Sequence, residues 1–132
     1  AEEQARIAAE KDAIAKLKRA EKVNKSIDSN IRQVQYLKID SPSGSYTSLG
    51  DCYFYGKGKD FDIAKAFLCY NLGAKQGEAE AFLRIAHYYE TGRSFGRFYL
   101  EQDSDLALAF YEKAETLGVS GAIEGIKRIK KQ

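Results

Sequence analysis

Few side chains in this 132-residue sequence have the types and spacings that chemistry requires. His87 is the one histidine, and no serine or cysteine nucleophile motif accompanies it. We interpret it as an exposed polar residue of a helix. No Cys/His spacing suggests zinc, and the Gly56–Lys59 segment lacks the strand and spacing of a phosphate-binding loop. The sequence therefore predicts no catalytic residue, no metal and no cofactor.

Two cysteines are the remaining reactive side chains. Cys52 and Cys69 are expected in two neighbouring antiparallel helices, which could bring them close enough for a disulfide. The alternative is that both are small buried apolar residues, the common situation of free cysteines. The sequence leaves both interpretations open, but two cysteines are too few for a disulfide-rich scaffold.

Charge and hydropathy narrow the class of protein further. There are 21 Lys and Arg against 19 Asp and Glu, a formal charge of +2, which is too balanced to make nucleic acid the leading partner. No apolar run approaches the roughly 20 residues of a membrane-spanning helix, so we expect a soluble chain. The sequence begins at Ala1 and has no Met, which suggests a removed leader or a piece of a longer protein.

A change in composition divides the chain near residues 40–44. Helix formers and charges precede it, whereas all eleven glycines and most aromatic residues lie at or beyond it. Pro42 disfavours helix at the preceding residue, and Gly44 frees the backbone for a turn. We predict an N-terminal helix or helical hairpin over residues 1–40, with Ser26 or Ser29 as the cap of a second helix in the hairpin. A globular part follows over residues 45–132.

The expected N-terminal helix has two parts. Large apolar residues recur every three or four positions over residues 20–39, which predicts packing against the globular part. Residues 1–19 contain few of them and are expected to form a solvated helix. A coiled-coil partner is the alternative, so homo-oligomers could form through this helix.

An internal repeat predicts the fold of the globular part. Core positions of a first unit recur 36 residues later in its first helix and 41 residues later in its second, so a five-residue insertion lengthens the second unit. This period is typical of an α-solenoid of helix-turn-helix units. We predict an all-α fold with repeats over about 45–77 and 78–118 and a closing helix over 120–131. The recurring residues are Leu49, Tyr53, Gly56, Ala66, Tyr70 and Gly77, followed by Ile85, Tyr89, Gly92, Ala107, Tyr111 and Gly118.

Small residues have a defined place in each unit. Gly50 and Ala86 are expected where the neighbouring helix approaches, because only a small residue permits close contact there. Gly56 and Gly92 are expected to end the first helix of each unit, where glycine adopts the left-handed conformation without strain.

This pattern resembles the Sel1-like repeat, an α-solenoid unit related to tetratricopeptide repeats. The second unit departs from it at Ala86, at Ser94 and in its longer loop. The resemblance implies a non-catalytic scaffold that binds another protein or peptide as an adaptor, regulator or inhibitor. The alternative is a structural module of a bacterial envelope-associated or secreted assembly, linked through the N-terminal helix; many relatives are exported or work in secretory compartments. The first-unit matches are Leu49, Gly50, Tyr53, Gly56, Gly58, Lys65, Ala66, Tyr70, Ala74 and Gly77.

Two groups of residues are candidates for partner binding. The inserted loop combines arginine with aromatic residues, a mixture enriched at interface hot spots, although its aromatic rings could instead seal the edge of the solenoid. A polar strip along the first helix of each unit suits peptide recognition, although it could be a plain solvated face. The loop group is Arg93, Phe95, Arg97, Phe98 and Tyr99; the strip is Ser48, Asp51, Tyr55, Arg84, His87, Thr91 and Arg128.

Overall fold

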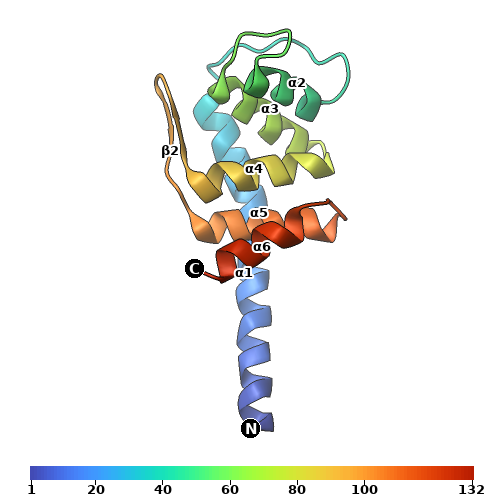
Figure 1. Ribbon diagram of the computed structural model, residues 1–132, viewed down its shortest axis with the longest axis vertical. Coiled ribbons are helices and arrows are strands. Elements are labelled where there is room, and N and C mark those ends of the chain that lie inside the picture. Colours follow the sequence, from blue (N-terminus) through green and yellow to red (C-terminus); the bar gives the residue numbers. More distant parts are fainter.

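The computed structural model describes residues 1–132 as six helices and one short β-hairpin. Figure 1 shows the later helices stacked as antiparallel pairs, with α1 running behind them and its N-terminal part projecting from the body. The predicted all-α solenoid with a long N-terminal helix is therefore confirmed. The elements are α1 (Glu2–Val34), α2 (Tyr46–Tyr55), α3 (Ile63–Lys75), α4 (Ala79–Thr91), β1 (Arg93–Phe95), β2 (Phe98–Leu100), α5 (Ser104–Thr116) and α6 (Ala122–Lys130).

The N-terminal segment is one unbroken helix, not a hairpin. Ser26 caps nothing; its hydroxyl lies 2.9 Å from that of Tyr89. The helix ends at Val34, before the predicted boundary near residue 40. The chain then turns and continues in an irregular segment, in which Leu37 and Ile39 pack against the core. Within that segment the N–H of Asp40 donates to the hydroxyl of Tyr53 over 3.3 Å. No helix of the chain combines the length and apolar composition needed to cross a bilayer.

The second half of α1 belongs to the core of the body. Val23, Ile27 and Val34 are buried, as the apolar spacing predicts. Asn30 is buried among them, and its side-chain amide donates to Oδ1 of Asn71 and accepts from the hydroxyl of Tyr89, each over 3.1 Å. These polar contacts join α1 to α3 and α4, so the helix is fixed in one position on the solenoid.

The two repeats begin and end their second helices in the same way. Asp62 accepts a hydrogen bond from the N–H of Lys65 at the start of α3, and Asp103 accepts one from Leu106 at the start of α5, both over 3.0 Å. Past the other ends of α3 and α5, Gly77 and Gly118 have positive φ angles of 82° and 78°. The two repeats therefore share the residues that begin and end their second helices as well as their core positions.

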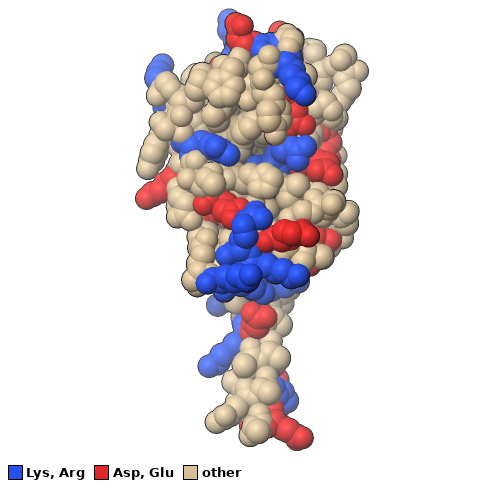
Figure 2. Space-filling model, viewed as in Figure 1, with Lys and Arg blue, Asp and Glu red and all other residues tan.

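Close helix contact depends on glycine at two places, each against the recurring tyrosine of a second helix. A Cβ added at Gly50 would lie 2.6 Å from Cε1 of Tyr70, and one added at Gly125 would lie 2.4 Å from Cε1 of Tyr111. Gly50 therefore has the role that the sequence predicts. Gly125 extends it to α6, the last helix, whose outer surface carries a cluster of basic side chains (Figure 2).

The insertion of the second repeat forms an antiparallel β-hairpin rather than an irregular loop. Phe95 pairs with Phe98 next to Gly96, whose φ of 58° permits the tight turn. Phe98 is buried, with its ring centroid 5.3 Å from that of Phe67, and Phe95 packs edge to face on Phe61 at 5.6 Å. These two rings seal the edge of the solenoid.

Both cysteines are free thiols in this fold. Cys69 is completely buried in α3, and Cys52 in α2 is half-buried. Burial raises the pKa of the Cys69 thiol to about 12. Cys69 therefore behaves as a small apolar core residue and not as a nucleophile.

Candidate binding site

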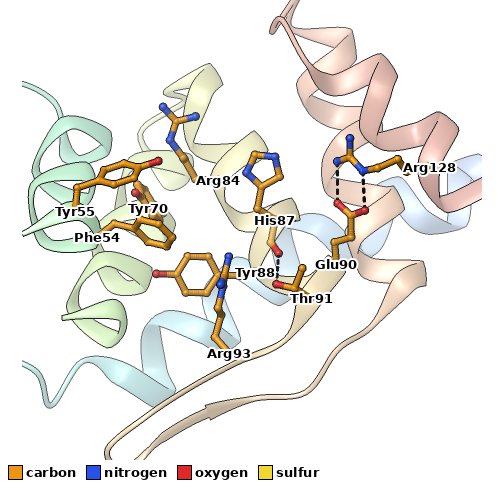
Figure 3. Close-up of a pocket in the computed structure, with 10 residues that line it drawn as sticks. All are labelled: Phe54, Tyr55, Tyr70, Arg84, His87, Tyr88, Glu90, Thr91, Arg93 and Arg128. Carbon is orange, nitrogen blue, oxygen red and sulfur yellow. Dashed lines mark hydrogen bonds and ion pairs between the residues drawn. The ribbon is translucent and has the colours of Figure 1, made fainter. Parts of the chain in front are cut away.

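A cavity of about 390 Å³ opens on the face of the solenoid formed by α2, α4 and α6. Its lining comes from both repeats and from the closing helix, so it exists only when the helices are stacked (Figure 3). We call it the inter-repeat cavity. It is lined by Phe54, Tyr55, Tyr70, Arg84, His87, Tyr88, Glu90, Thr91, Arg93 and Arg128.

One side of the inter-repeat cavity is built on an acidic residue of α2. Asp51 accepts a hydrogen bond from the hydroxyl of Tyr70 over 2.6 Å and one from Nε of Arg84 over 3.0 Å. Burial, together with this bond to a carboxylate, raises the pKa of Tyr70, so its hydroxyl stays protonated and remains a donor. The cluster joins α2, α3 and α4.

The other side repeats this arrangement one unit later. Glu90 accepts a hydrogen bond from Nε of Arg128 over 3.0 Å (Figure 3). It also accepts one from the hydroxyl of Tyr111, so this cluster joins α4, α5 and α6. The hydrogen bonds from Arg128 lower the pKa of Glu90, so its carboxylate is ionised at neutral pH. Two tyrosine–carboxylate–arginine clusters thus link the successive helices from α2 to α6, and each cluster joins three of them.

His87 lies half-buried between the two clusters, not exposed as expected. Its ring centroid is 5.7 Å from that of Tyr111. Burial lowers the pKa of the imidazole below its ordinary value, so the ring is neutral at pH 7. The side chain makes no hydrogen bond in this structure, which leaves a polar but uncharged surface at the centre of the cavity.

Arg93, the first residue of β1, completes the lining. Its guanidinium carbon lies 5.5 Å from the centroid of Phe54 and 5.6 Å from that of Tyr88, within range for cation–π contact with both rings. Unlike the other two guanidinium groups of the cavity, it forms no ion pair. Its Nε is buried and has no hydrogen-bond partner.

The structure brings together residues from both predicted groups. Six of the twelve candidates line the cavity, and Asp51 is bonded to one of them, Arg84. Ser48 is exposed near the start of α2, where its hydroxyl accepts from that of Ser45 over 2.9 Å. The six lining residues are Tyr55, Arg84, His87, Thr91, Arg93 and Arg128.

The rest of the hairpin lies outside the cavity. Phe95 and Phe98 pack inward, whereas Arg97 and Tyr99 are exposed, and the guanidinium carbon of Arg97 lies 5.7 Å from the ring centroid of Tyr36. Both interpretations of the inserted segment therefore apply to part of it: Phe95 and Phe98 seal the edge of the solenoid, whereas Tyr99 faces outward.

Four of the ten lining residues were not among the candidates from the sequence. The repeat alignment places Tyr70 and Tyr111 at equivalent positions. Glu90 and Arg128 lie three positions, about one helical turn, beyond the positions that align with Asp51 and Arg84. This shared offset of three was the available signal. The four residues are Phe54, Tyr70, Tyr88 and Glu90.

The stacked helical pairs and the cavity that they share define a repeat-built α-solenoid. No group of three or more His, Cys, Asp or Glu is arranged to hold a metal. The Sel1 repeat family model matches residues 44–78 and 79–119. The chain belongs to the Sel1 repeat family, whose repeats are generally modules for protein–protein interaction. No solved structure matches the chain.

Proposed function

We propose that this chain is a non-catalytic module that binds a segment of a partner protein in the inter-repeat cavity. The observation that supports this most directly is that both repeats and α6 contribute to one concave site. Its volume of about 390 Å³ is within the range of ligand sites and has room for a few peptide side chains. Aromatic and arginine side chains, the residue types enriched at interface hot spots, form most of its walls.

The chemistry of the lining also favours binding over catalysis. The cavity contains no serine or cysteine, and His87 has no hydrogen-bonded acid or nucleophile to work with. General acid–base and covalent catalysis both require such a partner within hydrogen-bond reach. The side chains that do meet in the cavity instead hold each other in place, as expected of a recognition surface.

Filling the cavity should abolish binding without unfolding the protein. Thr91 is exposed at the end of α4 and lines the cavity, so Thr91→Trp would occupy its space. Peptides selected from a random display library on the wild-type chain should lose at least about tenfold in affinity for this variant, measured by fluorescence polarisation.

Thr116→Trp is the matched control. Thr116 ends α5 as Thr91 ends α4, and each hydroxyl donates to the carbonyl four residues earlier. It lies outside the cavity, so the control should bind like the wild type. Equal affinity of the wild type and both variants would show that the cavity is not the binding site.

A second candidate function rests on the projecting part of α1. Ile7, Ile14 and Leu17 are exposed there, the last two by 52% and 66%. At 3.6 residues per turn they share the face of α1 opposite to the one that packs on the body. This supports a structural module that joins copies of the chain through α1, in an envelope-associated or secreted assembly as the family resemblance implies.

Self-association through this face should be sensitive to charge. Ile14→Glu with Leu17→Glu should convert a concentration-dependent oligomer into a monomer in sedimentation equilibrium, with the thermal midpoint unchanged because neither side chain packs on the fold. Gln4→Glu with Ala9→Glu adds the same charge outside that face and should leave association intact. A wild-type chain that is monomeric at millimolar concentration would rule this function out.

A further inference from the structure

Arg93 is the one charged side chain of the inter-repeat cavity that has no partner in the protein. Its Nε is buried without a partner, and the guanidinium takes part in no ion pair. A buried donor left unpaired costs free energy, and a bond from a guanidinium to an anion is among the stronger hydrogen bonds. The guanidinium carbon lies 5.5 Å and 5.6 Å from the ring centroids of Phe54 and Tyr88, which are themselves 6.0 Å apart, so it packs beside both rings. Arg93 is therefore a fixed donor without an acceptor.

The charges around the cavity leave room for one negative charge. Arg84 is paired with Asp51, and Arg128 is paired with Glu90. His87, between these pairs, is neutral at pH 7. Arg84 also lies 3.5 Å from Glu80. Arg93 is therefore the one arginine of the cavity without a carboxylate partner, and a monovalent anion would neutralise it.

We infer that the inter-repeat cavity binds one carboxylate of the partner segment on Arg93, with an apolar or aromatic side chain of that segment against Phe54 and Tyr55. The inference rests on the proposed binding function and specifies its ligand. A planar guanidinium can hold a carboxylate with two parallel hydrogen bonds. Tyr55 is exposed beside Phe54, so an aromatic surface for the neighbouring side chain is already present.

A carboxylate fits this site better than a phosphate does. A phosphate group carries about −1.5 to −2 charges at neutral pH and is commonly held by several cations. Here two of the three arginines already neutralise carboxylates of the protein itself. A dianion would have to compete with Asp51 and Glu90 for them, whereas a carboxylate needs Arg93 alone.

The test uses two small probes that differ at one group, a charged carboxylate in the first and a neutral carboxamide in the second. N-acetyl-phenylalaninate and N-acetyl-phenylalaninamide have the same aromatic side chain, but only the first has a carboxylate. In a ¹H–¹⁵N NMR titration at pH 7, the first should shift the Nε–H signal of Arg93 saturably, and the second should bind at least about tenfold more weakly, as expected from the loss of a charged hydrogen bond.

Two variants locate the effect. Arg93→Gln removes the charge and should make the affinities of the two probes equal, with folding verified by circular dichroism. Arg97→Gln changes an exposed arginine on the same hairpin, outside the cavity, and should keep the preference for the carboxylate. The Nε–H shift in the wild-type protein tests the assignment without any substitution.

Three results would overturn the inference: equal affinity of the wild type for both probes, an unmoved Nε–H signal at saturation, or tighter binding of phenyl phosphate than of the carboxylate. The proposed function fails separately, if the wild type and both tryptophan variants bind the display peptides equally. If display peptides bind the wild type but not Thr91→Trp, and show no acidic residue in common, the binding module is retained and the carboxylate site is rejected.

Discussion

Replacing Arg19 with leucine is expected to lower the free energy of unfolding by about 3–5 kcal/mol, among the largest effects of any single substitution outside the aromatic core. Nε and Nη2 of Arg19 in α1 each lie 2.8 Å from a carboxylate oxygen of Glu112 in α5. Their side chains are only 11% and 9% exposed. Removing the arginine would leave a buried carboxylate without its partner, and chemical denaturation would measure the loss.

The chain offers a matched control for this ion pair. Lys22 and Asp105 join the same two helices over 3.1 Å, but their side chains are 57% and 53% exposed. Lys22→Leu should therefore change stability by no more than about 0.5 kcal/mol. Replacing Arg19 and Glu112 together with leucine should recover most of the loss, because no charge stays buried. A similar loss in Arg19→Leu and Lys22→Leu would contradict the prediction.

Gly50→Leu is expected to destabilise the fold by about 3 kcal/mol, the upper end of the range for overpacked sites. Its side chain would begin 2.6 Å from Cε1 and 2.8 Å from Cδ1 of Tyr70. That ring is fully buried and its hydroxyl is bonded to Asp51, so it cannot swing away without breaking the cluster. The thermal midpoint should fall by about 12 °C, at roughly 4 °C per kcal/mol for a domain of this size.

Gly44→Leu separates steric overlap from the general effect of replacing glycine. No atom lies within 4 Å of a Cβ at Gly44, and its φ is not positive. This variant should keep wild-type stability within about 0.5 kcal/mol. If Gly50→Leu is equally stable, α2 does not approach α3 as closely as the structure has it.

The repeat could be predicted from the sequence because its signals are local or strictly periodic. Residue type and position restrict the N-caps of the second helices to Asp60 or Asp62 and to Asp103 or Ser104, and the fold uses Asp62 and Asp103. The role of Gly50 follows from its place beside a core leucine. Such features recur at fixed offsets, since each unit has to bury the same faces against its neighbour.

Other features depend on contacts between distant residues, and the sequence pattern does not specify these. Helix formers fill residues 2–34, so a break at Ser26 was as compatible with composition as no break; the bond between Ser26 and Tyr89 arises only in the packed fold. The burial of Phe98 depends on a space beside Phe67 that forms only when α3 and α4 pack together. The inter-repeat cavity was not predicted for the same reason, because its lining residues come together only in the packed fold.

The two tyrosine–carboxylate–arginine clusters have a mechanical consequence. Each ties three successive helices together, one through Asp51 and the other through Glu90. Changing the curvature of the stack would break at least one of them, so the solenoid is stiff along the wall of its cavity. A partner therefore binds a surface that is already preorganised, and little of the binding free energy is lost in rearranging that surface.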